Sequence, residues 1–180
     1  MEITSVKSRF GKDIYRLDNG TSIKMKKGSG TVDVNEKGVV KISGGENVSV
    51  SGSNKDDKIL IENSSIKKVS LGGGENKLWF NGCKFNDFNM FLGSGTEITT
   101  ANEWGDRKKG SSEIYVNGDF TGYINAQQGS VTGHGDDKDY HKDTIIVNGD
   151  NKGDIQIDSH DKVRIKGDKG HLYNQSVYVI

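Results

Sequence analysis

Residues 59–71 read ILIENSSIKKVSL, and residues 78–90 read LWFNGCKFNDFNM. When the second stretch is laid on the first, apolar residues coincide, so that Ile61 falls on Phe80 nineteen positions later. Ile42 lies nineteen positions before Ile61. Short β-branched and aromatic runs that return at one fixed period, separated by Gly, Asn and Asp, indicate structural repeats that stack on one another.

The same register can be followed towards the N-terminus. Ile23 lies thirty-eight positions before Ile61, and Val50 lies nineteen before Val69. Two short strands per repeat of about 19–20 residues would give about nine coils in 180 residues, which predicts an all-β, single-stranded parallel β-helix with little or no α-helix. A meander of antiparallel hairpins is the alternative, since it also produces short strands at this spacing.

The second half of the chain carries its own repeat. Residues 114–119, IYVNGD, match residues 145–150, IIVNGD, at an offset of thirty-one. This offset agrees with the shorter period if residues 133–143 form a loop insertion, and the irregular stretch 101–112 is predicted to form another. Residues 1–20 are less periodic and are predicted to be an N-terminal cap.

Composition indicates a single domain over residues 1–180 that contains no membrane span. Hydrophobic residues make up 31% of the chain, Lys+Arg and Asp+Glu balance at 25 each, and there are 25 Gly and no Pro. A net charge of zero argues against a nucleic-acid-binding protein. Two short basic stretches, residues 24–27 and 67–68, are expected to be solvated strand faces or corners. The only cysteine, Cys83, is expected in the core.

Over residues 21–170 the period and composition resemble the right-handed coils of filamentous-haemagglutinin-like secreted adhesins. This resemblance implies a right-handed β-helix that is secreted or lies on the cell surface, although the N-terminus lacks the basic and apolar regions of a signal peptide. The motif repeated at residues 116–124 and 147–155 is similar to the spacing in bactofilins, which polymerise end to end. That resemblance implies self-association through the ends.

A glycine-rich stretch at residues 71–79 resembles the nonapeptide of calcium-binding β-rolls. Lys77 and Glu75 stand where that motif has Asp and Gly, so no calcium ligands are assigned. No metal or other cofactor is expected.

Candidate binding residues are drawn mainly from the two predicted loops. Trp104 and Arg107 in the first loop are expected to contact a sugar or a protein. Trp79 lies between Leu78 and Phe80 and should therefore point to the opposite side of its strand, as an exposed stacking surface. The second loop combines imidazoles and carboxylates that could bind a metal or form a polar turn, and its candidates are His134, Asp136, Asp137, Asp139 and His141.

These features favour a non-catalytic β-solenoid module of a bacterial or phage surface protein, acting as a rigid scaffold or as an adhesive rod for a glycan or protein. One alternative is a carbohydrate-active β-helix enzyme, in which Asp119 and Asp150 could supply the acidic pair. A second alternative is a self-assembling filament element.

Overall fold

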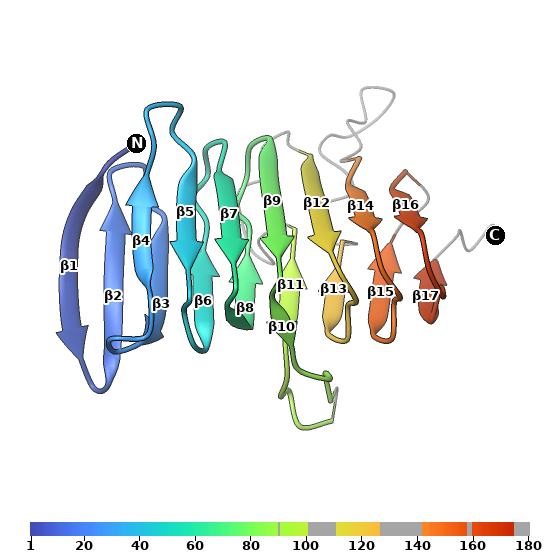
Figure 1. Ribbon diagram of the computed structural model, residues 1–180. Coiled ribbons are helices and arrows are strands. Elements are labelled where there is room, and N and C mark those ends of the chain that lie inside the picture. Colours follow the sequence, from blue (N-terminus) through green and yellow to red (C-terminus); the bar gives the residue numbers. More distant parts are fainter. Residues whose placement is uncertain (90, 101–110, 127–141, 158–159, 175–180) are drawn as a thin grey trace.

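The computed structural model describes residues 1–89, 91–100, 111–126, 142–157 and 160–174 (Figure 1). Its regular elements are all strands, arranged in two sheets of ten and seven strands, and no helix occurs within these ranges. The expectation of an all-β protein is confirmed.

The larger sheet contains ten strands, of which β10 (Lys84–Phe85) pairs only with β8. The other nine follow the spatial order β1 (Ile3–Arg9), β2 (Lys12–Leu17), β3 (Ser22–Lys26), β6 (Val48–Ser51), β8 (Ser65–Ser70), β11 (Glu97–Thr99), β13 (Tyr123–Asn125), β15 (Asp154–Ile157) and β17 (His171–Asn174). The seven-stranded sheet follows the order β16 (Lys162–Ile165), β14 (Thr144–Val147), β12 (Ser112–Asn117), β9 (Asn76–Asn81), β7 (Lys58–Glu62), β5 (Val40–Ser43) and β4 (Thr31–Val34).

The pairings among the strands from β5 onward are parallel, and several of them follow the predicted register. Ile61 lies between Ile42 and Phe80 in the seven-stranded sheet. Ile114 pairs with Ile145 across the offset of thirty-one. The repeat in the sequence therefore reports real neighbours over this part of the chain.

The prediction of a single-stranded β-helix of about nine coils is wrong. Strands β1, β2, β3 and β6 pair antiparallel, as do β4 and β5, so both sheets are mixed. Ile23 pairs with Val50 and lies in a different sheet from Ile42. The turn between β1 and β2 explains the first reversal, since Phe10 and Gly11 both have positive φ, 50° and 71°, as a tight hairpin turn requires.

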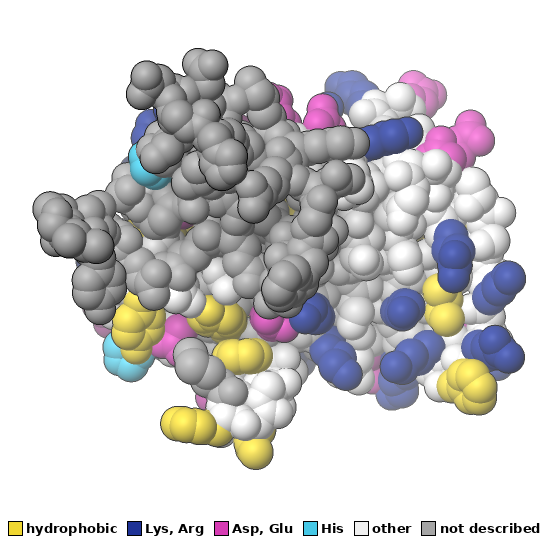
Figure 2. Space-filling view, turned by 180° about the vertical axis from the view of Figure 1, so that it is seen from behind, with side chains coloured by type: hydrophobic (Ala, Val, Ile, Leu, Met, Phe, Trp, Pro, Cys, Tyr) yellow, Lys and Arg dark blue, Asp and Glu magenta, His cyan; other side chains and the backbone are white. Residues whose placement is uncertain are grey.

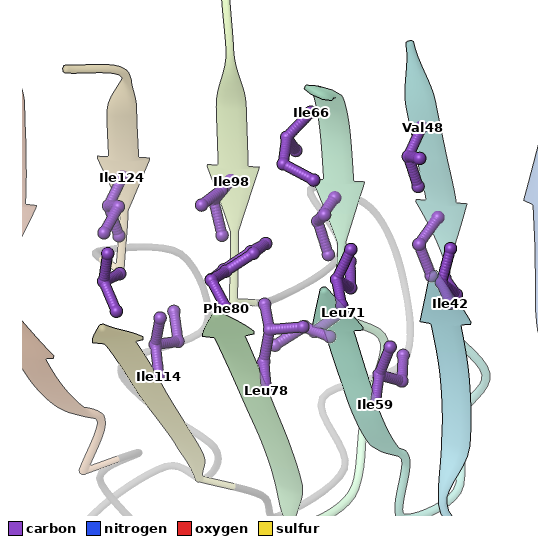
Figure 3. Close-up of a cluster of buried hydrophobic side chains, with 14 of the residues drawn as sticks. Ile42, Val48, Ile59, Ile66, Leu71, Leu78, Phe80, Ile98, Ile114 and Ile124 are labelled. Carbon is purple, nitrogen blue, oxygen red and sulfur yellow. The ribbon is translucent and has the colours of Figure 1, made fainter. Parts of the chain in front are cut away.

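The core lies between the two sheets and consists mostly of Ile, Val and Leu (Figure 3). Along β9, Leu78 and Phe80 are buried and the residues between and beside them are partly exposed, which is the alternation of a strand with one face in the core. Phe85 packs edge-on between Phe80 and Phe120, with ring centroids 5.2 Å and 4.9 Å away.

One departure from the repeat had not been predicted. The chain makes an excursion between β10 and β11, here called the 86–95 excursion, whose described residues are 86–89 and 91–95 and which is closed by an antiparallel bridge from Asn89 to Ser94. Phe88 is half-buried and stacks on Tyr123 with ring centroids 5.0 Å apart.

The two predicted loops lie mostly outside the described residues. Within the first, Ser112 is buried and begins β12. At the end of the second, Asp143 is buried and its Oδ1 accepts a hydrogen bond from the Ser112 N–H at 2.7 Å.

Buried polar residues lie at one end of the strands of the seven-stranded sheet, at or just before the first residue of a strand. The Asp57 N–H donates to Asn76 Oδ1 at 2.9 Å, as the Ser112 N–H does to Asp143. Each of these acceptor side chains thus takes a hydrogen bond from a backbone N–H at the neighbouring strand. That N–H would be costly to bury without a partner.

Candidate functional site

The outer face of the seven-stranded sheet carries a row of large apolar side chains. The parallel register places four of them on successive strands, namely Leu60, Trp79, Tyr115 and Ile146. All four are partly exposed, although they occupy the middle of a sheet. We call this set the apolar row.

Trp79 and Tyr115 form the centre of the apolar row. Their rings are nearly parallel, with an interplanar angle of 12° and centroids 6.1 Å apart. Leu78 and Phe80, on either side of Trp79, point into the core. The structure therefore places Trp79 on the outer side of its strand and adds Tyr115, which sequence reasoning did not single out.

An amide ladder runs beside the apolar row. Asn148 Nδ2 donates to Asn117 Oδ1 at 2.7 Å, Asn117 Nδ2 donates to Asn81 Oδ1 at 2.5 Å, and Asn81 Nδ2 donates to Glu62 Oε1 at 3.4 Å. Because the three asparagines and Glu62 are linked, the three amides are held in one direction along the sheet, with hydrogen-bonding groups left over for solvent or a ligand.

A charged cluster borders the other side of the apolar row. Glu113 Oε2 accepts hydrogen bonds from the Tyr115 hydroxyl at 2.7 Å and from Lys77 Nζ at 3.0 Å. These bonds, that of Tyr115 first, lower the pKa of Glu113 below its ordinary value. The same contacts raise the pKa values of Tyr115 and Lys77. At neutral pH the site thus holds a carboxylate, an ammonium group and a neutral phenol.

The depressed pKa of Glu113 predicts how Glu113→Gln changes stability with pH. A carboxyl group with a lowered folded-state pKa stabilises the fold above its unfolded value, near 4.5, and this contribution is lost as pH falls through the folded value. The variant should therefore be less stable than the wild type at about pH 7, by under about 1 kcal/mol because the pair is exposed to solvent. Urea denaturation at about pH 7 and pH 3 checks this, because the difference should be smaller at the lower pH. A difference that grows on acidification would contradict the assignment.

The other predicted binding residues lie outside the described part of the chain. They are Trp104, Arg107, His134, Asp136, Asp137, Asp139 and His141. Trp79 is thus the one predicted site residue that the structure places.

The acidic pair considered for catalysis is engaged in turns. Asp119 Oδ2 lies 2.9 Å from Lys152 Nζ, and Asp119 Oδ1 accepts the Asp150 N–H at 2.9 Å. Lys152 is the main reason that the pKa of Asp119 is lowered. Asp150 Oδ1 in turn accepts the Asp168 N–H at 3.0 Å. A general acid requires a carboxyl group whose pKa is raised, so this arrangement suits turn-forming residues.

Cys83 packs against the edge of the core and is half-buried. Burial is the main reason that the pKa of its thiol is raised, which opposes formation of a nucleophilic thiolate. No group of three or more His, Cys, Asp or Glu side chains placed to hold a metal ion occurs among the described residues.

Among the residues that the structure covers, no helical segment has the length and hydropathy needed to span a bilayer. The chain matches no known protein family, no curated protein and no solved structure.

Proposed function

We propose that this protein is a non-catalytic binding module that recognises a polysaccharide along the outer face of its seven-stranded sheet. One observation carries the proposal: the stacked pair of Trp79 and Tyr115 lies between the amide ladder and the charged cluster. Sugars present apolar C–H surfaces together with hydroxyl groups, and aromatic rings flanked by fixed donors and acceptors match both.

The direction of the apolar row supports a linear ligand. Its four side chains lie on neighbouring strands, which are spaced by roughly 4.8 Å. A chain of several sugar units lying across the strands would therefore meet repeated contacts. The described carboxyl groups support binding without turnover. A general acid requires a carboxyl group with a raised pKa, whereas the pKa values of Asp13, Asp18, Glu62, Glu113 and Asp119 are all lowered.

Trp79→Ala is expected to weaken polysaccharide binding at least tenfold, since it removes the largest side chain of the apolar row. The measurement is isothermal titration with oligosaccharides of cellulose, chitin, xylan and mannan, and with peptidoglycan fragments. The matched control is Thr31→Ala, an exposed change on edge strand β4 of the same sheet. The proposal fails if the wild type binds none of these probes, or if Trp79→Ala binds as tightly as the control.

A further inference from the structure

The three most exposed large apolar side chains of the described residues lie on two turns. Phe10, in the turn between β1 and β2, is 89% exposed, and Phe91 and Leu92, in the 86–95 excursion, are 101% and 76% exposed. Both turns project at the same end of the strands, at the bottom of Figure 1. Apolar side chains displayed in this way mark a surface that contacts something other than water.

A groove of about 650 Å³ lies between these two turns, on the outer side of the ten-stranded sheet. Gly11 lines it on one side and Gly93 on the other, and these are the chain neighbours of Phe10 and Leu92. The apolar tips therefore stand on opposite rims of one groove.

The groove is basic, because the fold brings together the two basic stretches of the sequence. Its lining includes four lysines, Lys12, Lys24, Lys26 and Lys67, and one acidic side chain, Asp87. Figure 2 shows Lys and Arg side chains gathered over this part of the face, with apolar side chains at its lower margin.

A β-bulge explains how Lys67 reaches this face. Val48 pairs with Ile66 and Ser49 pairs with Lys68, so Lys67 is the extra residue of β8. Ile66 and Val69 both point into the core, and the two lysines between them are both exposed. A bulge of this kind redirects side chains at a cost in sheet pairing. Here it places two lysines of β8, in place of one, on the outer side.

Most of these lysines have no acidic partner. Lys26 Nζ lies 2.6 Å from Glu46, and the neighbouring Lys68 lies 2.8 Å from Glu97. Within the described ranges, no ion pair is formed by Lys12, Lys24 or Lys67. Their charge is available to an anionic partner.

We propose that the surface formed by the basic groove and the two apolar turns docks on an anionic lipid bilayer. Phe10, Phe91 and Leu92 enter the boundary between headgroups and acyl chains, while the lysines of the groove contact phosphate groups. Basic side chains beside apolar ones are the pattern of proteins that lie on a membrane surface, and attraction to anionic lipid falls off within a Debye length. The net charge of the chain is zero, so the attraction to anionic lipid comes from the local positive charge of the groove.

A soluble polyanion would explain the lysines but not the apolar tips. The groove itself is lined by no aromatic side chain, so the bases of a single-stranded nucleic acid would find rings only at Phe10 and Phe91 on its rims, and the exposed Leu92 offers no ring for stacking. A bilayer accounts for both features.

The test is co-sedimentation with vesicles of phosphatidylcholine alone and of phosphatidylcholine mixed with phosphatidylglycerol. The protein should bind the mixed vesicles only, and less at higher salt. A double variant, Lys24→Glu with Lys67→Glu, should weaken binding at least tenfold. Its matched control, Lys37→Glu with Lys55→Glu, makes the same charge change in exposed turns at the opposite end of the strands and should bind like the wild type.

Insertion of the tips has a separate readout. In Phe91→Trp, the added tryptophan fluorescence should shift to the blue with mixed vesicles and be quenched by brominated lipid. Absence of vesicle binding, binding that the Lys24/Lys67 variant retains, or binding to heparin or oligonucleotides without vesicle binding would each overturn the proposal. Trp79→Ala should leave vesicle binding intact, which separates this result from a failure of polysaccharide recognition.

Discussion

Replacing Phe80 by alanine is expected to lower the free energy of unfolding by about 4 kcal/mol. The side chain is 1% exposed and packs against Phe85, and its strand neighbours in register are Ile61 and Val116. These residues belong to different strands of a narrow core, so the cavity cannot close by moving one of them. Denaturation by urea, followed by far-UV circular dichroism, measures the change.

Trp79→Ala is the matched control for this experiment, because it removes an even larger aromatic ring from the adjacent position on the same strand. Trp79 lies on the outer face and loses mainly its stacking on Tyr115, so a cost of about 1 kcal/mol is expected. Equal costs at the two positions would contradict the assignment of Phe80 to the core and Trp79 to the surface.

Asp57→Ala is expected to cost roughly 3 kcal/mol, although it removes no apolar contact. The carboxylate is 0% exposed and accepts hydrogen bonds from Thr21 Oγ1 at 2.7 Å, Asn19 Nδ2 at 2.8 Å and the Ser53 N–H at 2.7 Å. Its loss leaves the Thr21 hydroxyl and the Ser53 N–H buried and unpaired, while the half-buried Asn19 amide keeps only its 3.4 Å hydrogen bond to Ser53 Oγ. It also disconnects the turn before β3 from the turn between β6 and β7.

The control for Asp57 is its neighbour Asp56, an exposed residue that accepts one hydrogen bond, from the Glu75 N–H at 2.9 Å. Asp56→Ala should change stability by less than about 1 kcal/mol. Hydrogen exchange adds a local readout, because Asp57→Ala should weaken the protection of β3 amides more than that of β12 amides. Equal loss in both strands would argue against a specific link to the N-terminal turn.

How far the sequence predicts this fold depends on which part of the chain is considered. Around Ile61 and Phe80, alternation and period coincide, and the predicted pairing is the observed one. At Ile23 the period is also satisfied, yet the residue pairs antiparallel with Val50. Apolar spacing records which residues face the core but not the direction of the neighbouring strand. Direction is set by turns such as that at Asn19 and Gly20, which reverses the chain between β2 and β3, the strand that holds Ile23.

The candidate site shows the same division. Trp79 could be placed on the outer face because strand alternation fixes its direction. Its partner Tyr115 lies thirty-six positions later, so the period of nineteen residues does not reveal the pair. The convergence of Lys24 and Lys67 on one groove was also hidden, since it depends on the antiparallel N-terminal strands and on a bulge that no residue type announces.

The spacing between stacked residues has a consequence for how this protein can change. Along one inward row of the seven-stranded sheet, successive partners are Ile59, Leu78, Ile114, Ile145 and Val163, separated by nineteen, thirty-six, thirty-one and eighteen residues. The register is therefore kept by side chains that meet in the core, whatever length of chain joins them. Lengthening a connection between strands adds little to the entropic cost of closing that loop. Evolution, or an engineer grafting foreign peptides, can thus lengthen the connections between strands while leaving the two packed sheets as they are.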